Sequence, residues 1–126
     1  MQSLDYLVFD YSEDTEGMGT LEAAASIWPE QVPAVQAELA RVLDWAFTAF
    51  AGQRGPLEEG GDWDYDLQGL LEFTASQAVQ YDELMRRFSV APGPPGKPRH
   101  TYTLALSGTG EFCAAFRAQF GLDAPP

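Results

Sequence analysis

Residues 30–51 of the chain read EQVPAVQAELARVLDWAFTAFA, and this stretch decides the fold. Apolar side chains recur there at steps of three and four residues, which places them along one side of an α-helix. Pro33 fits only near the start of such a helix, where backbone N–H groups have no helical partner, and Gly52 is a typical stop. Glu38, in the first half, partly suits the helix dipole. The predicted stripe contains Val35, Leu39, Val42, Ala46, Ala49 and Phe50.

Two strands are predicted before this helix. Residues 4–11 (LDYLVFDY) are apolar on both alternating faces, which indicates a central strand covered at least in part on both sides. Residues 20–28 alternate between apolar and polar, although their alanines are poor strand formers and a helix competes there. The polar, glycine-containing turn between the two segments favours a hairpin. The small alanines indicate that something bulky packs over them.

Residues 52–62 are rich in glycine and are predicted to be a flexible loop. Residues 63–73 alternate again, which predicts a half-buried strand with an inward face. Residues 76–90 fit a helix or a strand, and we favour a strand because 63–73 needs a hairpin partner. Residues 91–98 (APGPPGKP) predict an exposed, poorly ordered loop. The inward residues of 63–73 are Trp63, Tyr65, Leu67, Leu71 and Phe73.

The C-terminal part contains a strand over 100–107 and a short helix. Thr109 is a good N-cap for that helix, and Gly121 is typical of its end. The turn 107–110 (SGTG) is interpreted as a tight connection and not as a phosphate-binding loop, because it lacks a third glycine and a P-loop lysine. The tail 123–126 is expected to fray. Phenylalanines recur every fourth residue as a docking ridge, at Phe112, Phe116 and Phe120.

Together these segments predict a single α+β domain over residues 1–126. Its length of 126 residues is close to the commonest domain size. The expected order is β-β-α-β-(β)-β-α, with a mainly antiparallel sheet of about four to five strands. The long helix and the short C-terminal helix are expected to pack on one face of that sheet.

The net charge of −12 argues against nucleic acid and anionic lipid as partners, because both require a basic surface. The charge is uneven: residues 1–85 hold 17 acids and 2 bases, whereas residues 86–126 hold 2 acids and 5 bases. No signal peptide, membrane-spanning stretch or cysteine pair is visible, so a cytoplasmic location is expected by elimination.

These features favour a small, acidic, non-catalytic interaction or accessory protein that binds a basic protein partner. No cofactor is predicted. A homodimer is also plausible, in which the basic loop of one copy meets an acidic cluster of another. The acidic surface expected to bind comprises Glu58, Glu59, Asp62, Asp64 and Asp66.

Two alternatives remain open. Asp62, Asp64 and Asp66 would project from one face of a strand, about 7 Å apart between successive Cα atoms, and a divalent cation would relieve their repulsion. This run is not an EF-hand, because its sixth and twelfth positions are Leu67 and Phe73. A small-ligand site on the same face belongs to this alternative. The other is an enzyme that uses His100 and Cys113, which follow one another as strand and helix.

Overall fold

The computed structural model describes residues 3–122. The α+β class and the order of elements are confirmed, and the frayed tail predicted at 123–126 lies outside the described residues. Two short 3-10 helices, η1 (Pro29–Gln31) and η2 (Leu57–Glu59), interrupt the loops. The main elements are β1 (Asp10–Glu13), β2 (Gly19–Ile27), α1 (Val32–Ala49), β3 (Trp63–Glu72), β4 (Ala75–Asp82), β5 (Arg87–Pro95), β6 (Arg99–Gly108) and α2 (Gly110–Gln119).

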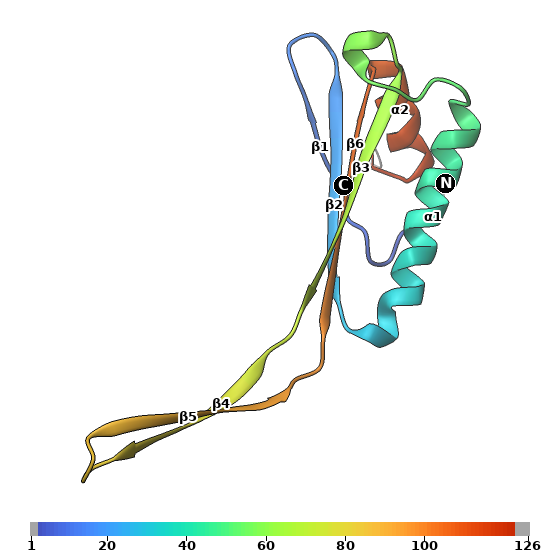
Figure 1. Cartoon of the computed structure of the whole chain (residues 1–126). Coiled ribbons are helices and arrows are strands. Elements are labelled where there is room, and N and C mark those ends of the chain that lie inside the picture. The colour runs from blue at the N-terminus through green and yellow to red at the C-terminus, as the bar shows by residue number, and fades with distance from the viewer. Residues whose placement is uncertain (1–2, 123–126) are drawn as a thin grey trace.

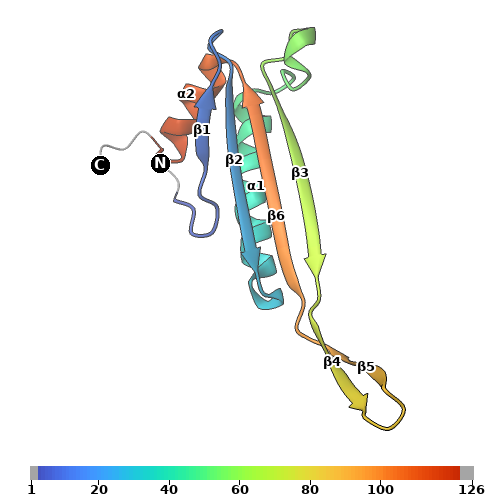
Figure 2. The same ribbon diagram turned by 90° about the vertical axis from the view of Figure 1, so that its left-hand side faces the viewer.

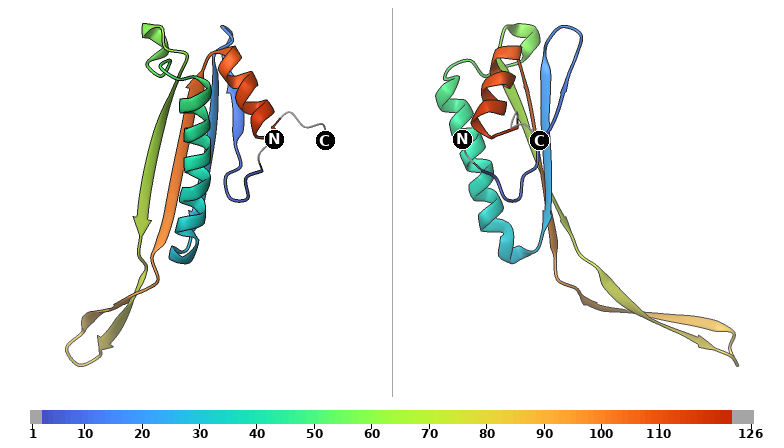
Figure 3. Two further views of the ribbon diagram at one scale, coloured as in Figure 1. Left: turned by 90° about the vertical axis from the view of Figure 1, so that its right-hand side faces the viewer. Right: turned by 180° about the vertical axis from the view of Figure 1, so that it is seen from behind.

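Four strands form one antiparallel sheet in the order β1-β2-β6-β3, with β1 and β3 at its edges. Both helices lie on one face of this sheet, as predicted, and leave the other face open (Figure 1, Figure 3). Along β2 every second residue is buried, which confirms the alternation of residues 20–28. We call the sheet and its two helices the body.

An aromatic cluster fills the end of the body where α2 joins the sheet. The Trp45 ring of α1 packs against the Phe112, Phe116 and Phe120 rings of α2, with centroids 5.7 to 5.8 Å apart. The buried Trp63 indole stacks on the Phe112 ring at 5.4 Å. Thr109 caps α2 as predicted, because its hydroxyl accepts a hydrogen bond from the Phe112 N–H. The predicted stripe of α1 is buried at Val35, Leu39, Val42 and Ala46.

The strand predicted over 4–11 is wrong for most of its length. β1 covers only residues 10–13 and is an edge strand, not a central one. Residues 4–9 form an irregular segment, in which Leu7 and Phe9 are buried and Val8 is 74% exposed. The physical reason is Glu38 of α1, whose carboxylate accepts hydrogen bonds from the backbone N–H groups of residues 5–7 that a strand would use for pairing.

The segment 76–90 contributes two strands, β4 and β5, joined by a turn. They pair with each other in a separate antiparallel sheet, so the expectation that 76–90 pairs with 63–73 is wrong. The partner of β3 is β6. We call residues 75–95 the arm. It extends the β3–β6 hairpin beyond the body and bends away from the helices (Figure 1).

Much of the loop predicted at 91–98 is strand, because β5 continues to Pro95. Proline has no backbone N–H, but a two-stranded antiparallel sheet tolerates proline where that N–H would point away from the partner strand. The glycines of this segment allow close strand approach where the chain bends. A Cβ on Gly93 would lie 2.5 Å from the Ser76 carbonyl oxygen, and one on Gly96 would lie 2.8 Å from that of Thr74.

The inward face predicted for 63–73 is buried only at its beginning. Trp63 is fully buried and Tyr65 half-buried, but Leu67, Leu71 and Phe73 are 42%, 48% and 59% exposed. Seen from the helix side in Figure 3, α1 runs over β2 and β6 and leaves the far half of β3 uncovered. The apolar alternation is therefore present without a second layer to cover it.

Candidate functional site

Figure 2 shows the sheet from the side that the helices do not cover. This open face carries carboxylates from three strands. Asp10 of β1 lies opposite Glu22 of β2, Glu22 lies opposite Ala105 of β6, and Ala105 lies opposite Asp66 of β3. One row across the sheet thus carries three carboxylates. In the next row, Asp64 follows on β3 opposite Ser107. We call Asp10, Glu22, Asp64 and Asp66 the acidic face.

Small side chains between these carboxylates leave two shallow depressions. One, of about 540 Å³, is lined by Asp10 and Glu22 among others. The other, of about 210 Å³, is lined by Asp64, Asp66 and Ala105 among others. Thr20 lines both depressions, so they adjoin on β2. The acidic face is therefore a shallow trough with Asp10 and Glu22 along one side and Asp64 and Asp66 along the other, and the exposed Val8 borders it beside Asp10.

The charge of this face is only partly neutralised within the chain. The Arg54 guanidinium donates to the Asp64 carboxylate at 2.9 Å and lies over the Tyr65 ring. Asp66 accepts a hydrogen bond from the Gln68 side-chain amide at 2.7 Å. Within residues 3–122, neither Asp10 nor Glu22 forms an ion pair. The acidic face keeps a negative excess in solvent.

The structure brings together only part of the predicted acidic surface. Asp64 and Asp66 lie on the acidic face, whereas Glu58 and Glu59 are exposed on η2, outside the sheet. Asp62 precedes β3, and its backbone is bonded to Gln53 and Thr109. Sequence reasoning missed Asp10 and Glu22, since a single sequence shows alternation but not which residues of distant strands lie opposite each other.

The arrangement of acidic side chains in residues 3–122 does not support the divalent-cation alternative. Within the described part of the chain, no three His, Cys, Asp or Glu side chains converge as metal ligands. Asp62 lies outside the strand, so the three aspartates are not a regular row on one strand. Asp64 is already held by Arg54.

The structure separates His100 and Cys113. His100 lies near the start of β6, whereas the Cys113 thiol is beside Gly108 at the end of that strand, about 26 Å away at the usual strand rise. Cys113 is buried, and burial raises the pKa of its thiol above the ordinary value. A thiol that holds its proton is a poor nucleophile, and the pair has no geometry for joint catalysis.

The carboxylate of Glu38 is buried, whereas the sequence predicted only that it would interact favourably with the helix dipole. Its side chain is 2% exposed and accepts hydrogen bonds from the backbone N–H groups of Asp5, Tyr6 and Leu7, at 2.7 to 3.1 Å. Arg41 lies one turn further along α1, 3.9 Å away. Glu38 therefore ties the irregular N-terminal segment to the helix. Its position three residues after Val35, within the apolar stripe, was the available signal.

Comparison of the chain with protein families, with characterised proteins and with solved structures finds no match. Among residues 3–122, no helix is both long enough and apolar enough to cross a membrane. Functional inference therefore depends on the geometry of the chain itself.

Proposed function

We propose that this protein is a non-catalytic interaction module whose acidic face binds a basic protein partner. The observation that carries the proposal is the row of Asp10, Glu22 and Asp66 across a sheet face that neither α1 nor α2 covers. A trough of small residues between carboxylates admits a chain segment rich in lysine or arginine, and the net charge of −12 steers such a partner toward it.

A homodimer built from the basic loop is less well supported. Lys97 pairs with Glu30 of its own chain at 2.7 Å, and Arg99 bonds to Ser26 and covers the Trp28 ring. These two cations are therefore engaged within one copy.

Two variants with equal net charge test the proposal. In Glu22→Gln/Asp66→Asn, two carboxylates of the acidic face are removed, whereas Asp44→Asn/Glu111→Gln removes two exposed carboxylates from the helices. Binding of a poly-lysine peptide, and recovery of partners from the native host, are measured at low and high salt. Binding should weaken with salt and should fall several-fold more in the first variant.

Equal losses in both variants would mean that only net charge matters, which would contradict a defined binding face. Binding that does not change with salt would contradict the electrostatic basis of the proposal.

A further inference from the structure

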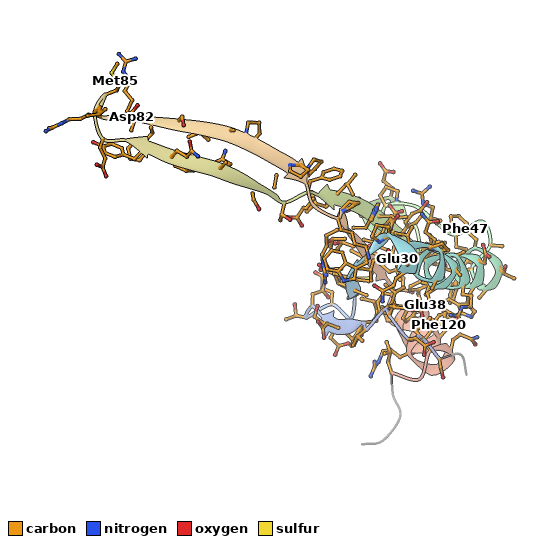
Figure 4. All side chains as sticks on the ribbon, turned by 90° about the horizontal axis from the view of Figure 1, so that it is seen from below. Glu30, Glu38, Phe47, Asp82, Met85 and Phe120 are labelled. Atoms are coloured by element: carbon orange, nitrogen blue, oxygen red, sulfur yellow. The ribbon has the colours of Figure 1, made fainter. Side chains whose placement is uncertain are left out.

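The two strands of the arm have no packed layer to stabilise them. It has only two strands, and every residue from 75 to 92 is exposed (Figure 4, where Asp82 and Met85 mark its tip). An isolated two-stranded hairpin is at best marginally stable in water, and a third strand or a packed face is needed to stabilise it. A stable arm therefore requires a surface that packs against it.

The register divides the arm into two different faces. On one face Val79 lies opposite Val90 and Tyr81 lies opposite Phe88, with ring centroids 5.0 Å apart. These four side chains are 52% to 71% exposed, and we call them the apolar arm face. The alternate positions of the two strands carry the small or polar pairs Ala78–Ala91, Gln80–Ser89 and Asp82–Arg87. One face of the arm is therefore suited to packing and the other to solvent.

Opposite charges sit on the two sides of the tip. Asp82 and Arg87 are the last pair of the ladder, and Glu83 and Arg86 are the first and last residues of the four-residue turn that joins β4 to β5. The turn is held by the Asp82 carboxylate, which accepts the N–H groups of Leu84 and Met85. Neither Glu83 nor Arg86 forms an ion pair within residues 3–122. The β4 side of the tip is thus negative and the β5 side positive.

We propose that the apolar arm face binds the same face of a second copy of this chain, about a two-fold axis parallel to the strands. Such an axis places β4 of one copy over β5 of the other. The apolar side chains then cover each other, and Glu83 of each copy lies opposite Arg86 of the other. This self-complementarity is what a two-fold interface requires.

The charge distribution supports this occupant. The arm contains two acids and two bases, so the net charge of −12 belongs to the rest of the chain. The axis places both bodies at the same end of the paired arms, but the contact itself lies on the neutral arm, which projects beyond the body (Figure 1). The inference goes beyond the proposed function, since the acidic face takes no part in it.

The first test is sedimentation equilibrium of the full chain over a range of concentrations. We expect a monomer–dimer equilibrium, and Phe88→Glu should weaken the dimer about tenfold or more, because it buries a charge against an apolar surface. Ser89→Glu, one residue along on the polar face, is the matched control and should leave the dimer unchanged. A chain that stays monomeric, or a dimer equally affected by both variants, would overturn the proposal.

The second test keeps the apolar arm face intact, so it does not depend on how Phe88→Glu folds. Glu83→Arg and Arg86→Glu should each weaken self-association, because like charges then meet across the axis. An equal mixture of the two variants restores both ion pairs and should form heterodimers more tightly than either variant alone. A mixture no tighter than its components would contradict the two-fold arrangement. Binding of wild-type monomer to anionic vesicles in place of dimerisation would also sink the proposal.

Discussion

Phe112 and Phe88 show how differently the same side chain is used in the two regions of this molecule. Phe112 is fully buried in the body, among the rings of Trp45, Phe50 and Trp63, whereas Phe88 in the arm is 71% exposed. Both lie in regular secondary structure. The difference is that the body has a helical layer over its sheet and the arm has none. Pairing between two strands buries little apolar surface, and a hydrophobic core forms only where a second layer covers the sheet.

The largest expected effect separates the two regions directly. Phe112→Ala should lower the free energy of unfolding by about 3–5 kcal/mol, because it leaves a cavity between stacked rings. Phe88→Ala should change the stability of the body by less than about 0.5 kcal/mol at low protein concentration, as expected for an exposed side chain. Urea unfolding monitored by tryptophan fluorescence measures both. Comparable losses would contradict the separation of arm and body.

Substitution of Glu38 tests whether the contact with the irregular segment 4–9 contributes to the stability of the body. Glu38→Ala should cost about 3 kcal/mol, because it leaves the buried N–H group of Leu7 and the part-buried N–H groups of Asp5 and Tyr6 without an acceptor. Asp44→Ala, an exposed acid on the same helix, should have little effect. Thermal unfolding compares the variants, and equal stabilities would show that residues 4–9 do not depend on this contact.

Thiol reactivity compares the body and the arm without truncating a buried side chain. Cys113 is buried in the body with its thiol pKa raised by burial, so at a given pH less of it is thiolate. It should react with a thiol reagent far more slowly than the exposed thiol introduced into the arm by Ser89→Cys. Rates measured in the folded protein should converge in denaturant. Rapid reaction of folded wild type would contradict the burial of Cys113.

The smallest effect is expected where arm and body meet. The hydrogen bond from Lys97 lowers the pKa of the Glu30 carboxyl. Because this pKa is lowered, the stabilising contribution of the pair is present above the ordinary pKa of glutamate and is lost as the pH falls through the lowered value. Lys97→Ala should return the pKa toward its ordinary value in an NMR titration, with little change in stability. An unchanged pKa would mean that the ion pair does not form in solution.

The sequence predicted those elements whose signal is local. Val35, Leu39 and Val42 recur at helical steps, and the 20–28 segment alternates, so both faces could be assigned before any contact was known. Residues 4–11 failed because their apolar pattern fits a buried strand equally well. Only the carboxylate of Glu38, more than thirty residues away, explains why residues 4–9 are irregular.

The candidate site was predicted in part for the same reason. Asp64 and Asp66 were identified from an acidic alternation within one segment. Asp10 and Glu22 join them only through the pairing of β1, β2, β6 and β3, which brings together residues up to about ninety positions apart.

The chain by itself determined its two helices, the alternating faces of residues 20–28 and 63–73, and its strong negative charge, because periodicity and composition are properties of neighbouring residues. The tertiary structure decided which carboxylates share a row, which apolar strand residues stay uncovered, and that residues 75–95 leave the body. Those outcomes depend on register and on the reach of α1 across the sheet, and both are set by contacts between segments far apart in the chain.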